Sequence, residues 1–60
     1  MGEEYKNTLG KYLRMLRKNK RIKQDAVAEA IGVKRATYSH YENGRIIPPT
    51  SMLATLSAFF

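Results

Sequence analysis

The apolar residues near the start of the chain recur at helical spacing. Three leucines stand at positions i, i+4 and i+7: Leu9, Leu13 and Leu16. This pattern predicts an amphipathic first helix of about three turns, capped by Asn7 or Thr8, and it places Gly10 on the exposed side. The residues before this helix are polar and are expected to form a short, frayed lead-in.

Two shorter apolar patterns follow, separated by Gly32. The first is a helix that begins at Gln24, and its apolar face consists of Val27, Ala28 and Ile31. Asp25 points away from that face, and its carboxylate in the first turn stabilises the positive end of the helix dipole. Gly32 supplies the left-handed backbone that ends one helix before the next begins. In the second pattern one side carries Thr37, Tyr38 and Tyr41, and the other carries Ala36, Ser39, His40 and Asn43. This is the outline of a helix-turn-helix over about residues 24–43.

The C-terminal part of the chain is uncharged from Ile46 to Phe60. Two adjacent prolines stiffen the connection after the third helix, and a fourth helix is expected to start at Thr50 or Ser51. The apolar face of this helix consists of Leu53, Leu56 and Phe60. It either fills the core or continues into a fifth helix and a partner surface. The predicted fold class is all-α, a compact bundle of four or five short helices.

Composition narrows the function classes. Sixty residues make one domain with a marginal core. With no cysteine and a single histidine, the chain offers no disulfide, no thiolate metal site and no zinc site, and no metal is expected. The net charge of +6 suits a polyanionic partner, although ordinary solubility explains the charge alone equally well. Lys11 and Arg14 are expected to form a solvated basic face. No paired carboxylates, activated nucleophile or glycine-rich phosphate loop indicate an enzyme or a cofactor. No leader or membrane span is predicted, so a cytoplasmic protein is expected.

Several features at matching spacing carry a resemblance to a known family. They are Gln24 opening the second helix, the pair Val27 and Ala28, Gly32, and the closing run Glu42, Asn43 and Gly44. Together they resemble the DNA-binding domains of the Cro/cI type, the xenobiotic-response-element family of bacterial and phage regulators. The likeness extends over roughly residues 9–60. It implies a lambda-repressor-like bundle that places its third helix in the major groove of DNA.

The outer face of the third helix supplies candidate base contacts. Arg35 suits guanine, because a guanidinium donates two parallel hydrogen bonds, and Ala36 offers a methyl-sized surface for thymine. Ser39 and His40 donate or accept hydrogen bonds, and His40 is alternatively a phosphate contact or a plain surface residue. Thr37 is also a candidate DNA contact. Neighbouring cations are candidate phosphate contacts: Lys23, Lys34 and Arg45.

Further roles follow from the resemblance. It makes Gln24 and Asn43 phosphate contacts that set the register of the domain on DNA. It also pairs Arg17 on the first helix with Glu42 on the third in a structural ion pair, which is costly to break from one side. Lys23 departs from the family pattern, which often has Ser, Thr or Asn as a helix cap at this position, so a side-chain cap is expected to be absent.

These observations predict a sequence-specific regulator that binds double-stranded DNA, a repressor by preference, acting as a homodimer on a two-fold operator. The alternative is a helical protein-interaction module, such as an antitoxin-type regulator, but the outer face of the third helix has no apolar anchors for it. RNA is a weaker candidate, because the tyrosines of the third helix are expected to face inward. The chain is expected to be a fragment of a longer regulator, its N-terminal part.

Overall fold

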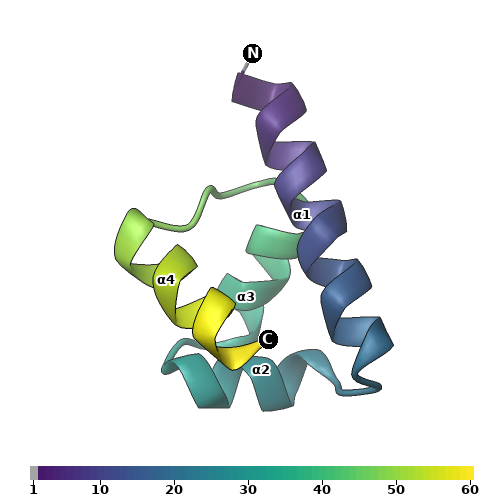
Figure 1. Cartoon of the computed structure of the whole chain (residues 1–60). Coiled ribbons are helices and arrows are strands. Elements are labelled where there is room, and N and C mark those ends of the chain that lie inside the picture. Colours follow the sequence, from purple (N-terminus) through teal and green to yellow (C-terminus); the bar gives the residue numbers. More distant parts are fainter. Residues whose placement is uncertain (1) are drawn as a thin grey trace.

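The chain folds into a bundle of α-helices (Figure 1). The computed structural model describes the backbone of residues 2–60 and the side chains of residues 4, 5 and 7–60. The helices are α1 (Gly2–Asn19), α2 (Gln24–Ile31), α3 (Arg35–Glu42) and α4 (Thr50–Phe59). No strand occurs among residues 2–60, so the predicted all-α bundle of four helices is confirmed, and a fifth helix does not occur within this range.

α1 begins earlier than the sequence indicated. Its helical backbone starts at Gly2 rather than near Asn7, so the expected frayed lead-in is wrong for the described residues. Met1, which belonged to that lead-in, lies outside them. The physical reason is that nothing in this segment breaks a helix. It contains no proline, and Glu4 lies near the start, where a carboxylate stabilises the positive end of the helix dipole.

One core joins the helices. Its buried apolar residues are Leu13, Val27, Ala28, Ile31, Tyr38, Tyr41 and Leu56. α3 packs against both α1 and α2, and α4 packs against α2. Tyr38 and Tyr41 are 0% and 5% exposed, and their rings meet edge to face with centroids 6.4 Å apart. The prediction that both tyrosines face inward is therefore confirmed, and α3 is left with only its opposite side for a partner.

α1 approaches α3 closely at Gly10. A Cβ atom built there would lie 2.3 Å from the carbonyl oxygen of Glu42 and 2.8 Å from that of Tyr41. Gly10 is therefore buried against α3, and its predicted exposure is wrong. The leucine spacing shows which face of α1 is apolar, but it does not show how close a neighbouring backbone comes.

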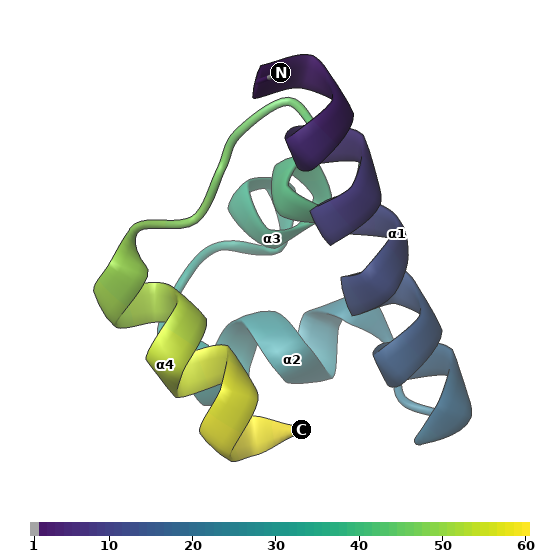
Figure 2. The ribbon, with the colours of Figure 1, turned by 45° about the horizontal axis from the view of Figure 1, so that its top comes forward.

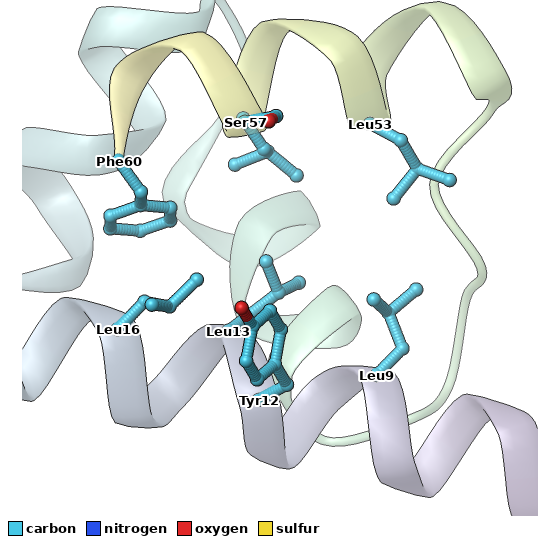
Figure 3. Close-up of a pocket in the computed structure, with 8 residues that line it drawn as sticks. Leu9, Tyr12, Leu13, Leu16, Leu53, Ser57 and Phe60 are labelled. Carbon is cyan, nitrogen blue, oxygen red and sulfur yellow. The ribbon is translucent and has the colours of Figure 1, made fainter.

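α4 begins at Thr50, as predicted, but it leaves part of α1 uncovered. α1 and α4 lie on opposite sides of the bundle (Figures 1 and 2). An open groove of about 340 Å³ separates them, and side chains of both helices point into it (Figure 3). The groove is lined by Leu9, Tyr12, Leu13, Leu16, Leu53, Leu56, Ser57 and Phe60. None of the described helices combines the length and the apolar character that a membrane crossing requires.

Candidate nucleic-acid interface

A tight turn fixes α3 relative to α2. Gly32 has a φ of 79°, and the N–H of Val33 donates to the carbonyl of Ala28 (3.0 Å), which closes the end of α2. Lys34 is extended, with φ −72° and ψ 151°, and the helical backbone of α3 starts at Arg35. The two helices and the turn between them form the helix-turn-helix arrangement that the sequence predicted.

The candidate contact residues differ in exposure. Those with exposed side chains are Lys23, Lys34, Arg35, Ala36, Asn43 and Arg45. Those that are half-buried are Gln24, Thr37, Ser39 and His40. Lys23 is extended at the start of α2 and its side chain makes no capping hydrogen bond, as predicted. The exposed candidates on α3 are therefore Arg35 and Ala36 in its first turn, with Asn43 exposed directly after its last residue.

The last turn of α3 is capped by the chain that follows it. The amides of Arg45 and Ile46 both donate to the carbonyl of His40, at 3.0 and 3.3 Å. The Nδ1 atom of His40 is buried and has no hydrogen-bond partner among the described residues. The two amide hydrogen bonds close the end of α3, and Ser39 and His40 on its outer face are only half-exposed, which the helical wheel did not predict.

A buried carboxylate joins α3 to α1. Glu42 is 2% exposed. Arg17 donates two hydrogen bonds to it, from Nε to Oε2 (2.6 Å) and from Nη2 to Oε1 (3.2 Å). The Nη1 atom of Arg17 donates to the carbonyl of Ile22 (3.0 Å). Arg17 therefore ties together α1, the α1–α2 turn and the end of α3.

The same carboxylate is connected to the protein surface. Nε2 of Gln24 donates to Oε1 of Glu42 (3.1 Å), and Oε1 of Gln24 accepts from Nη1 of Arg35 (3.3 Å). Nε of Arg35 lies 3.3 Å from Oδ1 of Asp25. Nε of Arg14 lies 3.5 Å from Oε1 of Glu42. A continuous set of contacts thus runs from the core to the first residue of α3.

Two members of this network were missed from the sequence. Arg14 was assigned to a solvated face, yet it lies one helical turn before Arg17 on the same side of α1, and this spacing was the signal. Asp25 was assigned only to the helix dipole. Its contact with Arg35 depends on how α2 and α3 meet, for which the sequence carries no direct signal.

Comparison with known proteins agrees with this geometry. A family of helix-turn-helix domains matches residues 8–60, which is most of the chain. The chain belongs to this family. The resemblance to regulators of the Cro/cI type is confirmed by two phage relatives of this helix-turn-helix domain.

The first relative of the helix-turn-helix domain is the ImmF control region 10 kDa protein of Bacillus phage phi105. It is 39% identical over 49 residues, which make up 82% of this chain and 54% of the relative. Repressor protein C of Escherichia phage P2 is 32% identical over 50 residues, or 83% of this chain and 50% of the relative. The chain spans about half the length of these two curated relatives. No solved structure matches it.

The buried network perturbs ionisable groups of the helix-turn-helix domain. Burial raises the pKa of Glu42, but hydrogen bonds from Arg17 and Gln24 stabilise the carboxylate more strongly, and its pKa falls below the ordinary 4.5. The hydrogen bond to Glu42 raises the pKa of Arg17. Burial, assisted by the charge of Glu42, raises the pKa of Tyr38. Glu42 and Arg17 therefore both stay ionised at neutral pH.

An open hollow of about 310 Å³ lies at the start of α2 of the helix-turn-helix domain. It is lined by Arg17, Lys23, Gln24, Asp25 and Arg35. Arg17 is paired with Glu42 and Arg35 with Asp25, so Lys23 gives this hollow a net charge of one positive unit, which favours an anion. Among the described side chains, no group of three His, Asp or Glu residues is placed to hold a metal ion. The chemistry of this surface is charge-assisted hydrogen bonding from arginine and lysine.

Proposed function

We propose that this domain binds double-stranded DNA in a sequence-specific manner, as the reading domain of a bacterial or phage transcription regulator that acts as a repressor in the cytoplasm. The observation that supports the proposal is the exposed first turn of α3, whose Arg35 is held by α2 in a domain of net charge +6. The first residues of a recognition helix contact base edges in the major groove. The two relatives are described as a control region protein and a repressor.

Base readout centres on Arg35. Its guanidinium donates two hydrogen bonds to a guanine, which contributes about 1–3 kcal/mol of discrimination against another base. Ala36, also exposed, packs against a thymine methyl group. Thr37, Ser39 and His40 contribute from the half-buried edge of the same face.

Phosphate contacts surround this turn and position the domain without reading sequence. The proposed phosphate contacts are Lys23, Gln24, Lys34, Asn43 and Arg45. Lys23 and Gln24 stand at the start of α2, where free backbone amides also attract an anion. If about six phosphates are neutralised in total, affinity falls roughly a thousandfold between 50 and 200 mM salt.

Selection of duplexes from a random pool tests the proposal. The wild-type domain is expected to enrich a defined sequence. Arg35→Ala is expected to lose preference at one base pair, whereas the control Lys11→Ala, which removes an exposed cation from α1, lowers affinity for all duplexes alike. Enrichment of no sequence would refute sequence-specific binding. A uniform loss on Arg35→Ala would make Arg35 a phosphate contact.

The proposed regulator acts as a homodimer on a two-fold operator, and a second copy of the chain covers the groove between α1 and α4. Charge supports this choice of surface. The α4 side of this groove lies within residues 46–60, which contain no charged residue, so a second copy that packs on α4 meets no lysine or arginine of that helix. Tyr12, which lines the groove, is 53% exposed and is available for the contact.

Comparing a palindromic duplex with its half-site tests the homodimer. Tyr12→Lys should weaken binding to the palindrome but not to the half-site. Thr55→Lys, an exposed position on α4 outside the groove, should leave both unchanged apart from a general gain in phosphate attraction. Equal affinity per half-site in the wild-type domain would exclude a cooperative dimer.

A module that acts through a different protein is the second candidate function. The exposed apolar residues that favour it are Tyr5, Tyr12 and Met15 on α1 and Ile46 and Ile47 in the connection after α3. The exposed candidate residues of α3 itself are Arg35 and Ala36, which offer no large apolar anchor. The duplex selection separates the two functions, because a protein-binding module enriches no DNA sequence.

A further inference from the structure

Arg35 is tethered to the start of α2. Its Nε atom lies 3.3 Å from Oδ1 of Asp25, and its Nη1 atom donates to Oε1 of Gln24 at 3.3 Å. The Arg35 and Asp25 side chains are 63% and 74% exposed. An exposed ion pair contributes little to stability, so this contact bears on the orientation of the Arg35 side chain rather than on the stability of the fold.

The Gln24 side of the tether has a fixed polarity. The carboxylate of Glu42 only accepts hydrogen bonds, so Gln24 must turn its NH₂ group toward Glu42. The carbonyl end of the Gln24 amide then faces Arg35 and accepts a hydrogen bond from its guanidinium. Arg17 in turn fixes Glu42 with two hydrogen bonds. The orientation of Arg35 is therefore set by a sequence of donors and acceptors that begins in the core.

The tether leaves Arg35 able to read a base. A guanidinium has five N–H donors, and the contacts to Asp25 and Gln24 use two of them. A guanine accepts two hydrogen bonds through O6 and N7, so the remaining donors suffice. A side chain held in one orientation before binding also loses less conformational freedom on the DNA.

We propose that Asp25 is a specificity-determining residue, which acts by positioning the guanidinium of Arg35 for one base pair rather than by touching DNA. This inference rests on the proposed DNA-binding function. The negative charge of Asp25 then has two opposite effects on DNA binding. A carboxylate near the duplex repels phosphates, so Asp25 weakens binding to every sequence and still strengthens the preference for one.

Asp25→Asn tests the inference, with Glu29→Gln as the matched control. Glu29 is exposed on α2 as well, and its substitution removes the same charge, but no contact joins Glu29 to Arg35 among the described residues. Affinity is measured for the selected duplex, for the duplex altered at the base pair assigned to Arg35, and for an unrelated duplex. Circular dichroism checks that both variants remain folded.

Both variants are expected to bind the unrelated duplex more tightly than wild type. Only Asp25→Asn is expected to reduce the affinity ratio at the Arg35 base pair, by about three- to tenfold. In an Arg35→Ala background, Asp25→Asn should no longer change that ratio.

An unchanged ratio in Asp25→Asn would overturn the inference, and an increased ratio would show instead that Asp25 holds Arg35 away from DNA. A wild-type domain with no preferred duplex would overturn the proposed function itself, which is a distinguishable result.

Discussion

The close approach of α1 and α3 makes Gly10→Ala the sharpest test of the fold. A Cβ at this position would lie 2.3 Å from the carbonyl oxygen of Glu42. A carbon and a carbonyl oxygen normally stay about 3.3–3.6 Å apart, so the two helices must separate by roughly 1 Å. The atom that obstructs the new methyl group belongs to the backbone of α3 and cannot rotate away.

Two opposing effects decide the magnitude. Alanine favours the interior of a helix over glycine by about 1 kcal/mol. Overpacking costs about 1–3 kcal/mol, and a shift of α3 also strains the hydrogen bonds between Arg17 and the buried Glu42, whose full loss costs about 3–5 kcal/mol. We expect a net loss of about 2–4 kcal/mol for Gly10→Ala. A domain of this size has a total stability of about 3–9 kcal/mol, so the loss is large.

Thermal and urea unfolding followed by circular dichroism measure the effect. The midpoint temperature of Gly10→Ala should fall by about 10–25 °C. Asn7→Ala is the control: Asn7 is exposed on α1, and alanine favours a helix more than asparagine does, so the free energy of unfolding should rise by a few tenths of a kcal/mol. A Gly10→Ala variant as stable as wild type would refute the contact between the two backbones.

Three further predictions concern the network and the turns. The pKa of Glu42 is lowered on folding, so the contribution of Glu42 to stability is complete above its ordinary pKa of 4.5 and is lost as the pH falls through the lower folded pKa. An NMR titration should therefore give a Glu42 pKa below 4.5. A pKa above 4.5 would contradict the ion pair with Arg17. Tyr38→Phe removes a buried hydroxyl whose pKa is raised by burial and by the nearby carboxylate of Glu42, so unfolding measurements should show a loss of about 1 kcal/mol, against almost none for Tyr41→Phe; a gain in stability would mean that the Tyr38 hydroxyl has no partner. Arg21 has a φ of 58°, so Arg21→Gly should raise the thermal midpoint by several degrees and Lys20→Gly should lower it; the reverse order would argue against a left-handed residue 21.

The parts of the fold that the sequence predicted are those set by local rules. The spacing of Val27 and Ile31 locates the buried face of α2, because a helix repeats every 3.6 residues. Gly32 marks the turn, because a left-handed residue favours glycine. Tyr38 and Tyr41 identify the inner side of α3 in the same way.

The parts that were missed depend on how helices meet. Burial of Gly10 follows from the position of the α3 backbone, and the contact of Asp25 with Arg35 follows from the angle between α2 and α3. Neither is encoded in a repeat along one helix. The half-burial of His40 likewise depends on tertiary packing rather than on the repeat of α3. The helical wheel could therefore find the outer face of α3 but not how far each residue on it is exposed.

Under the proposed function, the buried charge of Glu42 fixes the orientation of the Gln24 amide, which an apolar residue could not do. A well-packed leucine in its place, with an apolar partner for it on α1, would stabilise the core about as well. However, the two ends of the Gln24 amide are similar in shape, and only an acceptor beneath it makes one orientation correct. With leucine below, the NH₂ group of Gln24 would often face the donors of Arg35. A folded variant that has leucine in place of Glu42 and an apolar residue in place of its α1 partner Arg17 should therefore lose base-pair preference. A core variant such as Leu56→Ala, measured at a temperature where it is still folded, should keep that preference. Equal base-pair preference in the two variants would show that the charge of Glu42 does not affect recognition.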